Sequence, residues 1–200
     1  MNTKKLLAGF ICSIALLGAI TPTASAHNIT PSTAFRWEHV TYNSSYGHNV
    51  ARIQFNDDYA SSSWKPYTTQ MRANWNTNSN NYVNAVAYAF GSSNVDMANK
   101  ASWPAEWGAN TVATTRVFND GVDVSFSTAA MNSTDYAQIF TNPAADGLGS
   151  FMITLVGGHE LGHVFGLGHP PDGTVSIMTQ GQTNWQVPQA HDRTDLDYYY

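Results

Sequence analysis

The segment formed by residues 159–169 constrains this 200-residue chain more than any other part of it. It reads His-Glu-Leu-Gly-His-Val-Phe-Gly-Leu-Gly-His, so the three histidines are separated by four and then by six positions. On an α-helix, residues four apart share one face and lie about 5.4 Å apart along the axis. His159 and His163 can therefore aim both imidazoles at one point. His169 can join them only if the helix ends and the chain turns back.

Gly166 stands where that reversal is required. Glycine readily adopts the left-handed backbone conformation that commonly ends a helix. Pro170 and Pro171 then prevent the helix from resuming. The segment thus predicts a helix, a tight reversal at Gly166 and three imidazoles that converge on one point.

Three histidines that converge in this way are typical ligands of zinc, with Zn–N distances of about 2.0–2.1 Å. Three protein ligands leave a fourth position open, which is the catalytic arrangement, and the pKa of water bound there falls to about 7. Glu160 lies beside the ligands, so we expect it to act as a general base on that water. A purely structural zinc would favour four closed ligands, often cysteines, and no cysteine is nearby in the sequence.

The eleven-residue pattern resembles the signature of the metzincin clan of zinc metallopeptidases. That clan also has a methionine-containing turn beneath the zinc, and Ser176-Ile177-Met178 is similar to it in type and distance. The close resemblance covers residues 159–178, about a tenth of the chain. It implies a secreted zinc endopeptidase that hydrolyses peptide bonds, with His159, His163 and His169 as metal ligands, Glu160 as the catalytic base, and Gly166 and Met178 as structural support.

The resemblance also implies an α+β fold, in which helices pack on a twisted mixed sheet and the zinc helix lines a cleft. A strand shortly before that helix would border the cleft, and residues 111–118 are the candidate. An extended polypeptide substrate would add to the edge of this strand through main-chain hydrogen bonds.

The subfamily, matrixin-like or snapalysin-like, stays open. Gln180 stands two residues after Met178, where some metzincins have a tyrosine, and the Pro-x-Tyr segment usual in matrixins is missing from this position. Snapalysin-like enzymes have aspartate as the third ligand. Asp172 follows nearby, but the spacing of His169 matches the fuller signature.

Residues 1–26 have the pattern of a secretory signal peptide, with Lys4 and Lys5, an apolar run, and Ala24-Ser25-Ala26 as the cleavage site. The apolar run of about 15 residues is shorter than the roughly 20 needed to span a membrane. We therefore expect a freely secreted, extracellular and monomeric product without a membrane anchor. Residues 27–200 would form a single catalytic domain, in which residues 27–50 are an N-terminal arm or a short pro-segment, and the arm is favoured.

Composition and net charge limit the possible partners and the possible roles of cysteine. The net charge of −5 and the lack of a basic run argue against nucleic acid as a partner. The only cysteine, Cys12, falls within the predicted signal peptide, so the mature chain would have no disulfide and no cysteine to block the zinc.

Periodicity and turn signals predict the elements around the motif. Strands are expected at residues 50–56, 82–90, 95–98, 111–118 and 122–127, and helices at 61–76, 151–165 and 192–199. Asn119-Asp120-Gly121 is a strong hairpin signal. Ser61, Ser150 and Asp192 are the candidate helix caps, and residues 142–149 are expected to form a loop.

Several further sites are weaker alternatives. Structural calcium could bind at Asp57-Asp58 or at Asp120 and Asp123, although turn and surface roles suit these residues better. His39 and His48 could bind a second, structural zinc, but the local spacing expected of such a site is missing. His191-Asp192 could support the metal site from outside or cap a helix, and capping is favoured.

Two other functions compete with the peptidase. The chain could be a zinc-binding surface or adhesion module without turnover, given its many Tyr, Trp and Asn residues. It could also be a zinc amidase that acts on cell-wall peptides. Glu160 favours catalysis, because a site that only holds zinc has no need of a base.

Overall fold

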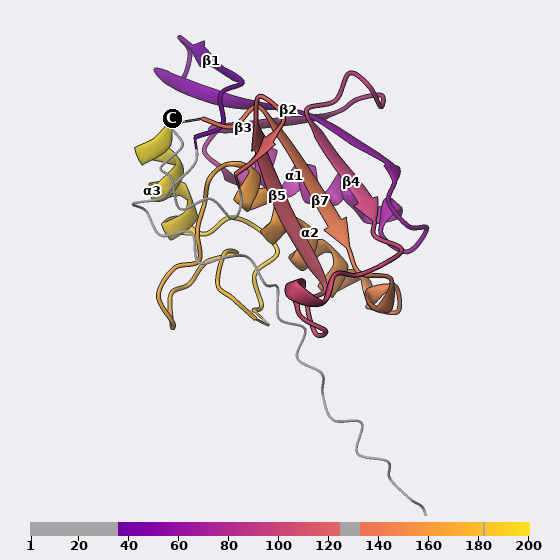
Figure 1. The fold of residues 1–200 in the computed structure, drawn as a ribbon. Helices are drawn as coiled ribbons and strands as arrows, with labels where there is room; N and C mark the ends of the chain where they lie inside the picture. Colours follow the sequence, from indigo (N-terminus) through magenta and orange to yellow (C-terminus); the bar gives the residue numbers. More distant parts are fainter. Residues whose placement is uncertain (1–35, 125–132, 182) are drawn as a thin grey trace, which may run out of the picture.

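The computed structural model describes residues 36–124, 133–181 and 183–200. Within these ranges the chain has a mixed α+β fold, in which three α-helices accompany one open, mixed β-sheet (Figure 1). Residues 1–26, the predicted signal peptide, lie outside the described residues, and so does the start of the predicted arm, residues 27–35.

The sheet contains parallel and antiparallel strands in the order β1-β2-β4-β7-β5-β6, and β3 pairs with β2. Strands β2, β3, β4 and β7 are parallel, whereas β1, β5 and β6 are antiparallel to their neighbours. The strands are β1 (Val40–Asn43), β2 (His48–Tyr59), β3 (Val83–Ala87), β4 (Val95–Asn99), β5 (Ala113–Asn119), β6 (Val122–Asp123) and β7 (Tyr136–Thr141).

The helices are α1 (Thr68–Asn78), α2 (Ser150–Val164) and α3 (Ala190–Tyr199). Within the described ranges, three short 3₁₀ segments lie between these elements: η2 (Lys65–Tyr67) before α1, η3 (Ala105–Trp107) between β4 and β5, and η4 (Pro143–Ala145) between β7 and α2. Helix α1 connects the parallel strands β2 and β3, as parallel pairing requires a crossover. Helices α1 and α2 pack against each other and against strands of the sheet, while α3 lies to one side near the C-terminal end (Figure 1).

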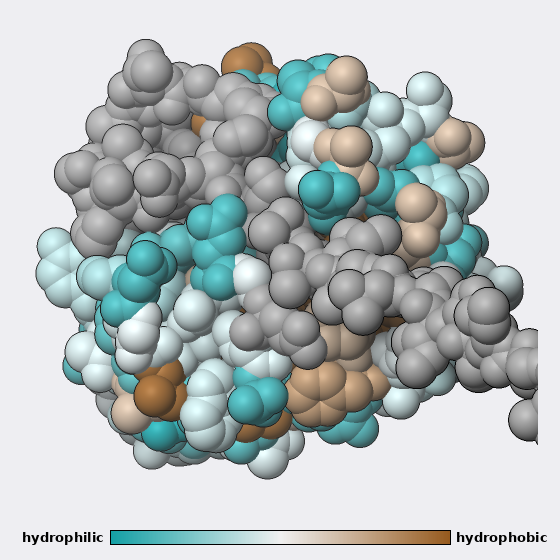
Figure 2. Space-filling view, turned by 90° about the horizontal axis from the view of Figure 1, so that it is seen from below, coloured by the Kyte–Doolittle hydropathy of each residue, from teal (hydrophilic) through white to brown (hydrophobic). Residues whose placement is uncertain are grey.

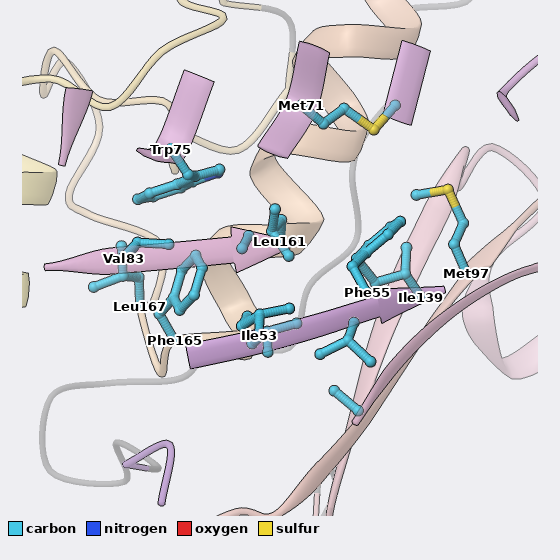
Figure 3. Close-up of a cluster of buried hydrophobic side chains, with 14 of the residues drawn as sticks. Ile53, Phe55, Met71, Trp75, Val83, Met97, Ile139, Leu161, Phe165 and Leu167 are labelled. Carbon is cyan, nitrogen blue, oxygen red and sulfur yellow. The ribbon is translucent and has the colours of Figure 1, made fainter. Parts of the chain in front are cut away.

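The hydrophobic core fills the space between these two helices and the sheet. Figure 3 shows Met71 and Trp75 of α1 above side chains of α2 and the sheet. The rings of Trp75 and Phe165 have centroids 5.1 Å apart. On β2, Ala51, Ile53 and Phe55 are buried, whereas Arg52 is exposed and Gln54 is half-buried, which is the period-two pattern of a strand with one covered face.

The expected strands at 50–56, 95–98 and 111–118 are confirmed as β2, β4 and β5, with small shifts of their ends. The strand expected at 82–90 is shorter, because β3 ends at Ala87. The hairpin signal is also confirmed: Asp120 and Gly121 both have positive φ, and β5 pairs with β6 across them. The end of the predicted strand 122–127 lies outside the described residues.

Three capping predictions are wrong. The helix expected from residue 61 begins only at Thr68, because Pro66 fits the preceding 3₁₀ turn, and the Ser61 hydroxyl donates to Asp146 instead. Ser150 is the first residue of α2 and not its cap. Asp192 is the third residue of α3, where it forms a capping box with Gln189.

Two strands were not predicted. β1 falls inside the segment that the sequence indicates as an arm, and it pairs with β2. In the same segment Trp37 is fully buried, so residues 36–50 form part of the packed domain. β7 lies at the centre of the sheet between β4 and β5.

None of the helices in the described ranges combines the length and the apolarity that crossing a bilayer would need. Figure 2 views the molecule from below, and the coloured part of this face shows hydrophobic residues in small patches among hydrophilic ones.

Candidate metal centre

Helix α2 carries the histidine motif through the interior of the domain. All of its residues from Ile153 to Val164 are buried. Neighbouring elements can approach the backbone of such a buried helix closely only where its side chains are small. A Cβ added to Gly157 would lie 2.3 Å from the Met71 side chain, and one added to Gly162 would lie 2.2 Å from Met178 Sδ. The glycines therefore let α1 and the methionine turn approach the helix backbone.

The helix ends as its sequence predicts. Gly166 has φ +85°, the left-handed conformation. Its amide donates to His163 O at 3.0 Å, and the Leu167 amide donates to Gly162 O at 3.2 Å. These two bonds form a Schellman motif, which satisfies carbonyls at the helix end and reverses the chain.

The reversal brings the three histidines together. His159 Nε2 lies 3.1 Å from His163 Nε2 and 3.1 Å from His169 Nε2. The ligand atoms of all three lie within 4.8 Å of one another. Two nitrogens on a tetrahedral zinc ion lie about 3.3–3.4 Å apart, given Zn–N distances of about 2.0–2.1 Å. The three histidines could therefore hold a metal ion.

Two main-chain carbonyls fix which nitrogen of each helix histidine faces the cluster. His159 Nδ1 donates to Ile177 O at 2.9 Å, and His163 Nδ1 donates to Leu167 O at 2.7 Å. Each bond places the proton on Nδ1 and leaves the lone pair on Nε2, which is the form that binds metal.

The electrostatics of the cluster favour neutral imidazoles. His159 is 1% exposed. Burial and the nearby His169 lower the pKa of His159 to about 3, although the hydrogen bond with Ile177 opposes the shift. The side chain is therefore uncharged near neutral pH, as a metal ligand must be.

Glu160 lies next to the ligands on α2 and is completely buried. Its Oε2 is 2.8 Å from the hydroxyl of Thr115 on β5, whereas its Oε1 has no hydrogen-bond partner among the described residues. Burial raises the pKa of Glu160 to about 7, and the hydrogen bonds with Thr115 oppose that shift. One oxygen is thus fixed by a hydrogen bond, and the other is buried without a partner. This arrangement suits a carboxyl group that exchanges a proton with a bound molecule.

The methionine turn, residues 176–178, lies directly beneath the cluster. Ser176, Ile177 and Met178 are all buried, and Met178 N donates to Ser176 Oγ at 2.8 Å. Met178 Sδ faces Gly162 on α2, and Ile177 O orients His159. Met178 thus packs against α2 at Gly162, and Gly166 forms the reversal after this helix.

Besides Thr115, two supporting residues were missed or misjudged from the sequence. Asp192, expected as a helix cap, is fully buried; it accepts hydrogen bonds from the Ser176 hydroxyl and from Ile177 N at 3.1 Å. Tyr200 donates to Phe165 O at 2.9 Å and accepts from Trp37 N at 3.2 Å. It therefore ties the end of α2 to the start of the described domain. No local pattern marks either role.

One edge of β5 lies close to the three-histidine cluster, because Thr115 contacts Glu160. The carbonyls of Val112 and Phe118 accept hydrogen bonds from the residues that flank β7, whereas the Val117 carbonyl accepts from Val124 beyond β6. Main-chain groups alternate between the two edges of an antiparallel strand. Ala113 and Thr115 therefore direct their main-chain groups to the β6 side, where β6 pairs only with Phe118 and Asn119 among the described residues.

The other candidate sites are separate from this cluster. His39 Nε2 contacts Asp135 O, and His48 stacks on Tyr82 with ring centroids 3.9 Å apart. In the described part of the chain, His159, His163 and His169 form the one group of three or more metal-ligating residues, so no second zinc site is seen there. Asp172 and Gln180 are not in that group.

The acidic residues considered for calcium have other partners. Asp57 and Asp58 lie 3.8 and 3.6 Å from Lys65 Nζ, and the Thr68 hydroxyl donates to Asp57. Asp120 occupies the hairpin turn, and Asp123 forms an ion pair with Arg116. His191 lies 3.4 Å from Asp195 and not beside the metal cluster.

Comparison with known proteins adds no assignment. None of the protein-family models matches the chain, and no curated protein matches it significantly. The three-histidine cluster, which could hold a metal ion, is therefore the functional feature that sequence and structure share.

Proposed function

We propose that this chain is a secreted, zinc-dependent endopeptidase of the metzincin type. The observation that carries the proposal is the convergence of His159, His163 and His169 beside Glu160, whose buried Oε1 has no partner among the described residues. A metal that only stabilises a fold needs no such carboxyl group. Its presence favours catalysis over an adhesion module that holds zinc without turnover.

The identity of the metal rests on the donor set. Three neutral imidazoles suit zinc, and a bound zinc ion supplies Lewis acidity that acidifies water and polarises a carbonyl. His159, His163 and His169 would hold the ion through Nε2. The carbonyls of Ile177 and Leu167 keep two of these rings in the correct tautomer.

Glu160 would move the proton during hydrolysis. Its carboxylate takes a proton from the attacking water and passes it to the amine that leaves. Thr115 holds Oε2, so that Oε1 stays directed at the reacting groups. Because the carboxyl is buried, its proton affinity is high enough to accept the proton and moderate enough to release it.

The edge of β5 suits an extended polypeptide substrate. Ala113 and Thr115 direct main-chain groups to the β6 side of the strand, and Thr115 also contacts Glu160, so this edge lies next to the catalytic carboxyl group. A substrate that adds as an antiparallel strand would be held without contacts to either of its ends. This mode of binding explains cleavage within a chain rather than at its termini.

The arrangement around the cluster agrees with the metzincin resemblance. The zinc helix ends at a glycine reversal, a methionine turn lies beneath the histidines, and an antiparallel strand borders the site on an otherwise largely parallel sheet. We infer that the domain has the metzincin fold and that the mature protein is a secreted monomer without a nucleic-acid partner. The signal pattern in residues 1–26 supports secretion.

Purified protein incubated with a proteome-derived peptide library tests the proposal. Mass spectrometry should find cleavage within peptides, loss of cleavage with a chelator, and recovery with zinc. Metal analysis of the same sample should give one zinc per chain. Cleavage of purified peptidoglycan without cleavage of any library peptide would instead identify a cell-wall amidase.

Two glutamate variants separate catalysis from metal binding. Glu160→Gln should retain one zinc per chain but lose at least about 100-fold in cleavage rate, because a positioned general base contributes about 10²–10⁴-fold. Glu106→Gln removes an exposed carboxylate from η3 and should cleave like the parent. Undiminished cleavage by Glu160→Gln would refute the assigned role.

A further inference from the structure

The sheet carries a second concave site away from the metal cluster. Two hollows of about 340 and 380 Å³ lie over β1, β2 and β3, and Thr41, Arg52 and Asn84 line both of them. They therefore form one continuous depression, which we call the outer trough. Each hollow is within the range of about 300–1,000 Å³ that is typical of small-molecule sites.

Most of the outer trough lies on the face of the sheet that the helices leave uncovered, and Asn76 of α1 also lines the first hollow. Ile53 and Phe55 of β2 point into the core, while Arg52 is exposed between Ala51 and Ile53. On β3, Asn84 and Val86 are exposed, while the residue between them, Ala85, is buried. Alternation along both strands thus places Arg52 and Asn84 on this uncovered face.

Tyrosines surround the trough. Tyr42 and Tyr46 line the first hollow and are 64% and 49% exposed, and Tyr88 lines the second and is 45% exposed. Of the eleven large hydrophobic residues that are exposed in the described ranges, six lie between residues 42 and 90. A tyrosine ring offers an apolar face and a polar tip, and this combination is suited to a ligand with both kinds of surface.

The remaining lining is rich in side-chain amides. Asn43, Asn81 and Asn84 belong to the first hollow, and Gln54 and Asn94 to the second. Each amide group can donate and accept hydrogen bonds at the same time. Neighbouring hydroxyl groups of a sugar do the same, and the carbon–hydrogen faces of a sugar ring can stack on tyrosine. Amides interleaved with tyrosines therefore match the surface of an oligosaccharide.

Arg52 indicates that the ligand of the trough carries negative charge. Arg52 lines both hollows, and no carboxylate side chain lines either one. The ion pairs found among the described residues do not involve Arg52. Arginine presents a planar fork of donors that matches a carboxylate in two-point contact.

We propose that the outer trough binds an oligosaccharide that carries carboxylate groups, such as a chain of uronic acid units. An extended peptide fits less well, because both edges of β2 at the floor of the trough are already paired with other strands. A partner helix would need a continuous apolar strip, whereas this lining is mostly polar. The proposal does not depend on the metal site or on peptidase activity.

Titration calorimetry of the full-length secreted protein tests the proposal. The probe is tetragalacturonate, and the comparison ligand is the neutral tetrasaccharide of galactose. We expect tetragalacturonate to bind, the neutral sugar to bind at least tenfold more weakly, and Arg52→Gln to weaken tetragalacturonate binding at least tenfold. Tyr42→Ala and Tyr88→Ala should each weaken the binding of tetragalacturonate.

Matched variants keep the experiment decisive. Lys65→Gln removes the same unit charge outside the trough and should bind like the parent. Arg52→Lys keeps the charge but loses the fork, so its affinity should fall between those of the parent and Arg52→Gln. Unchanged circular dichroism and thermal midpoints identify variants that are folded.

Three results would overturn the proposal. The first is no binding of tetragalacturonate by the folded parent. The second is equal affinity in the parent and a folded Arg52→Gln variant. The third is self-association in sedimentation experiments that Tyr42→Ala abolishes while no sugar binds, which would assign the trough to a second copy of the chain.

Discussion

Replacing Asp192 with asparagine should loosen the metal site from a distance. The buried carboxylate accepts from Ile177 N at 3.1 Å, from Gln189 N at 2.7 Å and from the Ser176 hydroxyl. Oδ2 receives both amides and Oδ1 receives the hydroxyl. Asparagine can keep its oxygen toward the two amides only if its NH₂ group faces Ser176 Oγ.

That orientation creates a conflict at Ser176. Its Oγ already accepts from Met178 N at 2.8 Å, so the hydroxyl proton loses its acceptor and the new donor must share the same oxygen. A hydrogen bond to a charged group contributes about 1.5–3 kcal/mol. We therefore expect Asp192→Asn to lower the free energy of unfolding by about 2–3 kcal/mol.

The same change should weaken zinc binding. Asp192 holds the amide of Ile177, whose carbonyl orients His159, so displacement of this turn misdirects one ligand. Loss of an outer partner of a metal ligand typically costs 10–100-fold in affinity. Urea unfolding monitored by tryptophan fluorescence and competition with a chromophoric zinc chelator measure the two effects.

Asp195→Asn is the matched control for this experiment. Asp195 lies on the same helix, its side chain is 39% exposed, and it pairs with His191 at 3.4 Å. Exposed ion pairs contribute about 0–1 kcal/mol, so this variant should unfold and bind zinc almost like the parent. If Asp192→Asn matched the parent in both measurements, the methionine turn would not depend on Asp192 and the reasoning would be wrong.

Two further predictions concern packing and alkaline stability. Gly162→Ala should lower the free energy of unfolding by about 1–3 kcal/mol through overpacking. The new Cβ would lie 2.2 Å from Met178 Sδ and 3.0 Å from the Trp75 ring. Gly147→Ala, which has open space around it, is the control in thermal unfolding. Burial and a hydrogen bond to Asp96 raise the pKa of Tyr136 to about 12. Since the unfolded pKa is about 10, this stabilisation is complete below pH 10 and is lost as pH rises toward 12. Tyr136→Phe should therefore flatten the dependence of stability on pH in that window, and an unchanged slope would exclude Tyr136 as its source.

Local sequence signals predict the metal cluster well because its parts are close in the chain. The helical spacing of His159 and His163, the reversal at Gly166 and the return of His169 all lie within eleven residues. Their geometry follows from helix periodicity and from the backbone freedom of glycine. Strands with clear alternation, such as β2, and the Asn-Asp-Gly hairpin are predictable for the same reason.

The supports of the cluster could not be predicted, because they come from distant parts of the chain. Thr115 meets Glu160 from 45 residues away, and Tyr200 reaches Phe165 from 35 residues away. Neither residue carries a local pattern that distinguishes it from any other threonine or tyrosine. The burial of β7 alternates regularly, but Tyr136 and Phe140 lie on its half-buried side and the polar Thr141 lies on its buried side, so the alternation does not appear in the hydropathy of the sequence. The position of Asp192 was misjudged because a capping residue at N3 resembles one at the N-cap in sequence.

The composition of α2 links the metal site to the folding of the whole domain. Three glycines, at positions 157, 158 and 162, each disfavour a helix by about 0.5–1 kcal/mol relative to alanine. The helix therefore depends on its contacts with α1 and the methionine turn, which the same glycines make possible. This packing holds the ligands in place, and local unfolding would remove it. Zinc that binds only the folded chain should therefore stabilise the domain as a unit. A site built on an alanine-rich helix would hold its ligands more independently, but it could not bring Met178 and Trp75 so close beneath them.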